Sequence, residues 1–137
     1  LPVEFYVSTG GGMVAEMFAL YDLMRMVRED CGIHTFGIGK VMSAGTLLLA
    51  AGTKGKRKIS KNCRVMIHNV AAGNFGTLPN LTNELEAIQQ LQEDYITAMV
   101  ENTKFTRKKL EKLLSEKVNI YLSAEEAVKY GLADEIM

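Results

Sequence analysis

The sequence has few cysteines, no excess of either charge and no long apolar run, and each of these features excludes a class of protein. Sixteen basic and sixteen acidic residues cancel, so no overall field attracts nucleic acid, anionic lipid or a highly charged partner. Cys31 and Cys63 lack the spacing of a metal site, a redox motif or a secreted disulfide framework. No apolar run approaches the roughly 20 residues of a membrane span, and residues 1–8 predict a strand, not a signal peptide. We expect a cytoplasmic protein that binds neither nucleic acid nor membrane.

The first half of the chain alternates strands with helices. At 137 residues and 47% hydrophobic, the sequence is long enough for one domain, residues 1–137, with its own core. Strand composition, glycine turns and helical spacing of apolar residues predict these elements: strand 3–7, glycine turn 8–12, helix 14–27, strand 35–38, helix 43–51 closed by Gly52, and strand 64–67. This alternation predicts an α/β layered domain with a largely parallel sheet.

The second half is predicted to be mainly helical. Apolar residues keep helical spacing from Leu81 to about Val100, which makes this the longest helix. Asn80 or Thr82 is the predicted N-cap of this helix, and Thr106 is the predicted N-cap of a helix that ends near Leu114. A short extended piece follows at 121–122. Ser123 and Glu126 then form the predicted capping box of a last helix, which Gly131 ends.

Ser43 and His68 are the residues that suggest catalysis. A nucleophilic hydroxyl needs a base, and of the chain's two histidines His68 is the better placed, at the end of a predicted strand. Each residue taken alone also has a structural interpretation, since serine is a favoured helix cap and a histidine after a buried strand can be a core residue. His34 is assigned no role.

Two other segments are interpreted structurally. The turn STGGG at 8–12 lacks the lysine and hydroxyl of a phosphate-binding P-loop and the full spacing of a dinucleotide-binding loop. The basic cluster at 54–61 has no interleaved aromatic residues, so we interpret it as a solvated loop.

Several segments together carry a resemblance to a known family. They are VMSAGTLLLAAGTKGKR at 41–57, RVMIHN at 64–69, STGGG followed by a helix with ALYDLM, and YLSAEEAVKYGLADEI at 121–136. In this order and approximate spacing they resemble the proteolytic subunit of the ATP-dependent Clp protease, the ClpP family, over almost the whole chain.

The resemblance implies a fold and an assembly. The family is similar in fold to the crotonases, with stacked ββα units and a protruding handle helix, which would be residues 80–101 here. Its subunits form two face-to-face rings around a proteolytic chamber, so we expect a homo-oligomer of stacked rings. The family's usual N-terminal unit, with axial loops and a first strand and helix, has no counterpart before residues 3–7. ATP would bind a partner unfoldase of the AAA+ class, and no cofactor is expected on this subunit.

The resemblance also implies roles for individual residues. Ser43 matches the nucleophile and His68 the general base of a serine peptidase acting on unfolded polypeptides or peptides. The amides of Gly12 and Ala44 match the oxyanion hole. Asn119 falls where the family's triad normally has aspartate, which implies weakened activity, unless a shift of register brings Glu116 to this position instead.

Two other functions stay open at this stage. One is a silent structural subunit of a mixed ring, an alternative that Asn119 in place of the triad aspartate favours. A crotonase-like acyl-CoA enzyme rests on fold analogy alone.

Overall fold

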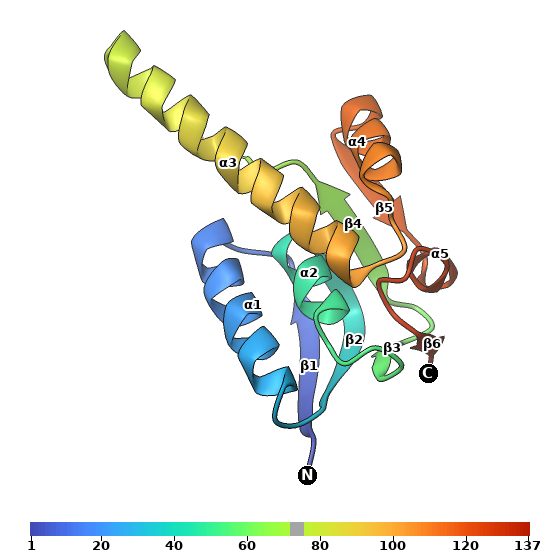
Figure 1. Ribbon diagram of the computed structural model, residues 1–137. Coiled ribbons are helices and arrows are strands. Elements are labelled where there is room, and N and C mark those ends of the chain that lie inside the picture. The colour runs from blue at the N-terminus through green and yellow to red at the C-terminus, as the bar shows by residue number, and fades with distance from the viewer. Residues whose placement is uncertain (72–75) are drawn as a thin grey trace.

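The fold is an α/β arrangement in which helices pack on a twisted sheet. The computed structural model describes residues 1–71 and 76–137 (Figure 1). Along the chain the elements are β1 (Val3–Thr9), α1 (Val14–Arg28), β2 (Ile33–Met42), α2 (Ala44–Ala50), β3 (Arg57–Ile59), β4 (Arg64–His68), α3 (Leu78–Asn102), α4 (Arg107–Glu116), β5 (Asn119–Leu122), α5 (Ala124–Lys129) and β6 (Glu135–Ile136). The predicted α/β class and its alternation of strands and helices are confirmed.

The sheet is organised around β2. This long strand pairs in parallel with β1 along one side, and along its other side first with β3 and then with β4. The main path runs β5-β4-β2-β3-β6, and among the described strands the β4–β5 pair alone is antiparallel, so the predicted largely parallel sheet is confirmed. The parallel pairing of β2 and β4 places the carboxyl ends of both strands, which carry Met42 and His68, at the same end of the sheet.

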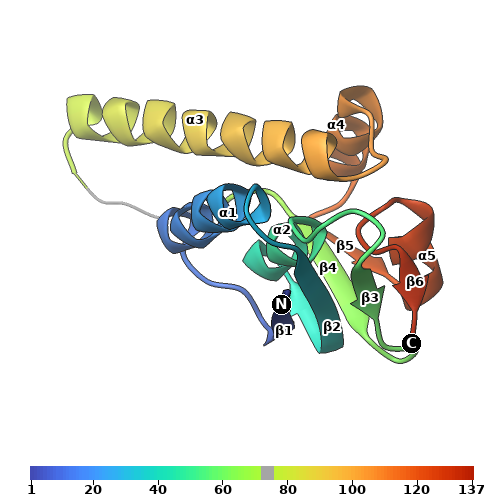
Figure 2. The ribbon, with the colours of Figure 1, turned by 60° about the horizontal axis from the view of Figure 1, so that its bottom comes forward.

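Helices α1, α2 and α3 cover one face of the sheet (Figure 2). Helix α2 consists almost entirely of buried residues because it lies between the sheet and α3. Helix α1 buries Met17, Tyr21 and Met24, one stripe of its predicted apolar face, whereas Met13 and Met26 are exposed. Burial of such side chains contributes roughly 1.5–3 kcal/mol each and holds these layers together.

Helix α3 is the predicted handle and protrudes from the domain (Figures 1 and 2). Its buried residues all lie in its last third, from Tyr95 to Asn102. The first half carries exposed apolar side chains at Leu78, Leu81 and Leu85. None of the described helices, α3 included, combines the length and the apolar character needed to cross a membrane.

The predicted helix ends are partly right. Thr106 accepts a hydrogen bond from Lys109 N–H, and Ser123 and Glu126 form the predicted capping box. The predicted caps of the long helix are wrong: α3 begins at Leu78, so Asn80 and Thr82 lie inside it. Pro79 allows this earlier start because proline is tolerated in the first turn of a helix.

The interpretation of residues 54–61 as a solvated loop is only partly right, since Lys54, Lys56 and Lys61 are exposed and outside the strands but the middle of the segment is not. Residues 57–59 form β3, and Arg57 is only 4% exposed. Its guanidinium donates to both carboxylate oxygens of Asp134 and to the backbone carbonyls of Ala50 and Asn102. A buried arginine needs such partners, and Asn102 and Asp134 are too distant in the chain for local charge counting to identify them.

Candidate active site

Ser43 occupies a strained turn between β2 and α2. Its φ of 54° and ψ of −117° make it the one non-glycine residue with a positive φ in the described part of the chain. Such a conformation costs of order 1–3 kcal/mol and persists only where surrounding contacts impose it. Two contacts do so: Ser43 N–H donates to the carbonyl of Met66 at 2.7 Å, and the Ser43 carbonyl accepts from Thr46 Oγ1 at 2.6 Å.

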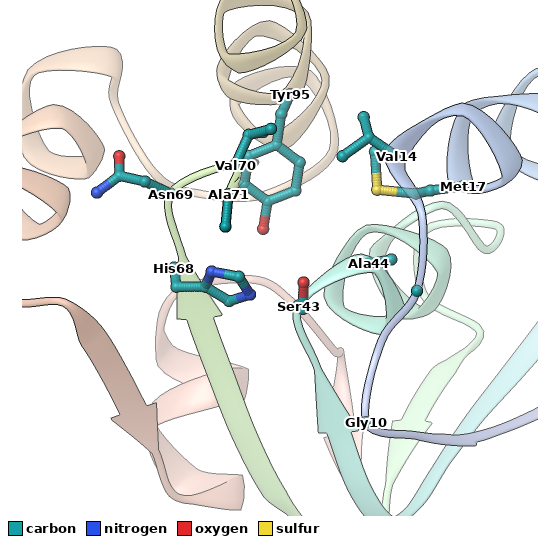
Figure 3. A pocket seen from close by; sticks show the side chains of 11 residues that line it. Gly10, Val14, Met17, Ser43, Ala44, His68, Asn69, Val70, Ala71 and Tyr95 are labelled. Carbon is teal, nitrogen blue, oxygen red and sulfur yellow. The ribbon is translucent and has the colours of Figure 1, made fainter. Parts of the chain in front are cut away.

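The hydroxyl of Ser43 is not used as a helix cap. Ser43 stands at the N-cap position of α2, yet its side chain makes no capping hydrogen bond. Instead it faces a pocket of about 280 Å³ (Figure 3). The capping interpretation of this serine is therefore wrong, and its hydroxyl is oriented toward space that a ligand can enter.

His68 lines the same pocket. It is the last residue of β4 and is half-buried, and its ring lies on the wall of the pocket beside Ser43 (Figure 3). The parallel pairing of β2 with β4 brings the two side chains together, because Ser43 directly follows the last residue of β2. The other residues that line the pocket are Gly10, Gly12, Val14, Met17, Ala44, Asn69, Val70, Ala71 and Tyr95.

The glycine turn packs directly against Ser43. Gly11 has a φ of 113°, and a Cβ atom placed on it would lie 2.8 Å from Ser43 Cβ, closer than real contacts allow. Its N–H donates to Thr9 Oγ1 at 3.0 Å, so this amide is already used. Gly12 lines the pocket, and across residues 1–71 and 76–137 no acceptor takes a hydrogen bond from its N–H. Gly12 thus offers an amide to a ligand in the pocket, whereas Gly11 does not.

Asn119 lies next to His68 but outside the pocket lining. The two residues are direct partners in the antiparallel β4–β5 pair, whereas Glu116 is the last residue of α4 and precedes the strand. The Asn119 side chain is exposed, and within the described residues no side-chain hydrogen bond joins it to His68. The register thus places Asn119, not Glu116, opposite the histidine.

A second set of polar residues surrounds the pocket, and the sequence did not indicate them. Tyr95 from α3 lines the pocket, and its hydroxyl lies 2.9 Å from Thr46 Oγ1. Gln92, one turn earlier, hydrogen-bonds Asn69 and the N–H of Val70. Tyr95 fits the apolar spacing of its predicted helix, and Thr46 lies within a short apolar helix, so the sequence suggested only core packing for both residues.

Burial shifts the pKa of two side chains, Tyr95 and Cys63. It raises the pKa of Tyr95 to about 12, an effect that the hydrogen bond with Thr46 partly offsets. Burial also raises the pKa of the Cys63 thiol, so this cysteine is a poor nucleophile. Within the described residues, no group of three or more histidine, cysteine, aspartate or glutamate side chains is arranged to hold a metal ion.

These features define a class of protein: an α/β domain in which a strained serine and a strand-end histidine face one pocket beside a glycine turn. A family model described as Clp protease matches residues 1–137. The chain is 34% identical over 135 residues to the ATP-dependent Clp protease proteolytic subunit of Deinococcus radiodurans, an alignment that covers 98% of this chain and 64% of that relative. The chain belongs to the Clp protease family, as its sequence motifs predicted.

Proposed function

We propose that this chain is a subunit of a serine peptidase that cleaves unfolded polypeptides or peptides through an acyl-enzyme. The observation that carries the proposal is that Ser43, held in a strained turn and free of capping contacts, lines one pocket with His68. Membership of the Clp protease family supports the same activity.

The chemistry follows from these groups. His68 takes the proton of Ser43 Oγ as the oxygen attacks the scissile carbonyl, and the amides of Gly12 and Ala44 donate to the oxyanion that forms. His68 then gives this proton to the leaving amine as the peptide bond breaks. In the second stage His68 removes a proton from water, which attacks the ester carbonyl and releases the acid, and the proton returns to Ser43 Oγ.

Asn119 is the proposed third member of the site. Its amide oxygen can accept a hydrogen bond from His68 Nδ1–H once the exposed side chain turns toward the ring, which lies on the neighbouring strand. An amide supplies no negative charge to stabilise the imidazolium, so turnover should be lower than with an aspartate here.

Assembly into stacked rings is part of the same proposal. The exposed leucines on the protruding half of α3 form an apolar surface of the kind that partner contacts cover. The handle would join the rings, and an AAA+ unfoldase that uses ATP would deliver polypeptide to the chamber. Both cysteines are free thiols, which suits a reducing cytoplasm.

A silent structural subunit of a mixed ring is the second candidate. The uncharged Asn119, which makes no side-chain hydrogen bond to His68 within the described residues, favours it. A crotonase-like acyl-CoA enzyme is a weaker third candidate, because only the fold analogy suggests it.

Covalent labelling distinguishes these candidates. The assembled protein is treated with a serine-directed fluorophosphonate, and the adduct is measured by intact mass, with Ser43→Ala as the control. Labelling of the parent but not of Ser43→Ala supports an activated Ser43. An unlabelled parent in a well-formed oligomer would favour the silent subunit, and thioester hydrolysis that survives Ser43→Ala would favour the acyl-CoA enzyme.

A further inference from the structure

The handle helix contacts both walls of the pocket through two polar side chains. Gln92 and Tyr95 are three residues apart on α3 and so lie on the same side of it. Tyr95 approaches the segment that carries Ser43, and Gln92 approaches the segment that follows His68. Figure 3 shows the ring of Tyr95 entering the pocket from the handle, above Ser43 and His68.

The hydroxyls of Tyr95 and Thr46 form a directed chain of hydrogen bonds that ends on Ser43. Thr46 Oγ1 donates its one proton to the Ser43 carbonyl at 2.6 Å. In the 2.9 Å hydrogen bond between the two hydroxyls, Tyr95 must therefore be the donor and Thr46 Oγ1 the acceptor. Tyr95 is 4% exposed and Thr46 0%, so both hydroxyls are buried. Hydrogen bonds in such a buried chain strengthen one another.

This chain of hydrogen bonds acts on Ser43, the one non-glycine residue with a positive φ among those that the structure describes. The Ser43 carbonyl accepts from both the N–H and the hydroxyl of Thr46, while the Ser43 N–H is held by Met66. Because both the N–H and the carbonyl of Ser43 are held, its φ of 54° is maintained and its hydroxyl stays directed into the pocket. Loss of the Thr46 hydroxyl, or of the proton that Tyr95 donates to it, would let the turn relax.

Gln92 holds the other wall of the pocket. Its Oε1 accepts from Val70 N–H at 2.8 Å, and its Nε2 donates to Asn69 Oδ1 at 2.6 Å. Asn69 in turn donates to the carbonyl of Leu114 at 3.0 Å. Because Asn69 and Val70 directly follow His68, these bonds limit how far the end of β4, and the imidazole with it, can shift.

We propose that Tyr95 and Gln92 are positioning residues: Tyr95, through Thr46, sets the conformation of Ser43, and Gln92, through Asn69 and Val70, sets the location of His68. The inference rests on the proposed peptidase function. Neither side chain needs to contact the reacting atoms. Burial raises the pKa of Tyr95 to about 12, so the phenol keeps the proton that it donates throughout the working pH range.

The test measures how fast Ser43 reacts in variants that delete one hydrogen-bonding group. Tyr95→Phe and Thr46→Val should each lower the rate constant of fluorophosphonate labelling and the peptidase kcat by roughly 10- to 100-fold, because small displacements of a nucleophile are costly. KM should stay nearly unchanged. Thr46→Ser keeps the hydroxyl and should retain most of the rate.

The double variant tests whether the two hydroxyls act as one unit. Tyr95→Phe combined with Thr46→Val should lose no more rate than the more damaged single variant, since each deletion alone breaks the chain. If Tyr95→Phe fails to fold, the comparison of Thr46→Val with Thr46→Ser tests the same link. Tyr6→Phe, at an exposed tyrosine, is the matched control and should label like the parent.

Gln92 has a matched control on the same helix. Gln92→Met removes both hydrogen bonds at similar volume and should lower kcat by roughly 10-fold or more. Gln90→Met makes the same change at an exposed position whose amide donates a hydrogen bond to Asp94 on the same helix. Its kcat should equal that of the parent.

The outcomes separate this inference from the function on which it rests. If the parent labels at Ser43 while Tyr95→Phe, Thr46→Val and Gln92→Met react as fast as the parent, the peptidase assignment stands and the positioning role is wrong. A Thr46→Ser variant as slow as Thr46→Val would also contradict it. If the assembled parent does not label at all, the proposed function itself fails, and the inference with it.

Discussion

His68 and Asn119 are directly opposite one another across the antiparallel β4–β5 pair. Directly opposed residues share a face of the sheet and have Cβ atoms about 4.5–5.5 Å apart, so a side chain at 119 can reach the imidazole without movement of the backbone. This relationship decides which residue can contact the imidazole of His68, and it depends on strand register.

Asn119→Asp should therefore raise peptidase turnover. A carboxylate would accept the imidazole N–H and stabilise the charged ring, neither of which an amide does as well. In a serine protease the reverse change lowers turnover by about 10⁴, which sets the upper limit, and we expect a gain of roughly 10-fold or more. Steady-state kinetics on the assembled variant measure this gain. Unchanged turnover with fold and assembly intact would mean that position 119 does not orient His68.

Gly11→Ala should abolish labelling of Ser43 in a folded protein. The new methyl group would lie 2.8 Å from Ser43 Cβ and 3.3 Å from its hydroxyl oxygen, and it would sit on a backbone with a φ of 113°. Gly55→Ala is the matched control, because Gly55 also has a positive φ, of 89°, but open space around it. Both variants should lose about 1 kcal/mol or more of stability, and only Gly11→Ala should lose reactivity. A labelled Gly11→Ala protein would contradict this packing.

Charge on the handle should prevent assembly. Leu81→Glu with Leu85→Glu places two carboxylates on the exposed apolar surface of α3, where Leu81 is 40% and Leu85 54% exposed. If this surface joins rings, the desolvation of two charges should shift the protein to smaller species in analytical ultracentrifugation. Asn83→Glu, on the opposite side of the helix, should leave the mass unchanged. An unaltered mass for the leucine variant would exclude this surface from the ring contact.

Asp134 should make stability depend on pH in the acid range. Burial alone would raise its pKa, but hydrogen bonds and the charge of Arg57 outweigh burial and hold the pKa of Asp134 below its ordinary value of 3.8. The folded state therefore binds this proton less readily than the unfolded state. The stabilisation is complete above about pH 4 and is lost as the pH falls through the lowered folded-state pKa.

Asp134→Asn measures this contribution. The variant leaves the buried Arg57 without its countercharge, and we expect a loss of about 3 kcal/mol in the free energy of unfolding at pH 7. The difference from the parent, measured by urea unfolding, should shrink below pH 4. Asp30→Asn, at an exposed position, should behave like the parent at every pH. If the difference in unfolding free energy between parent and Asp134→Asn stayed constant through the acid range, the Arg57–Asp134 ion pair would not be its source.

Much of the fold could be predicted because it depends on local patterns. Hydrophobic spacing indicated α1 and α3, the composition of residues 3–7 and 64–67 indicated two strands, and the Ser123–Glu126 spacing indicated a capping box. The short strands β3 and β6 were missed because they are held by partners far along the chain. Arg57 in β3 is an example, since the buried contacts that justify its position come from Asp134 and Asn102.

The sequence by itself determined the family, the α/β class and the two residues, Ser43 and His68, on which the proposed chemistry rests. Only the tertiary structure decided how they are held. Ser43 has its positive φ in the folded protein, where Gly11 packs against it. Three contacts join segments distant in sequence: that of Gly11 with Ser43, the pairing of His68 with Asn119, and the approach of Tyr95 to Thr46. Local propensity cannot encode such contacts, because they arise only when β2, β4 and α3 pack together and exclude water from the groups between them.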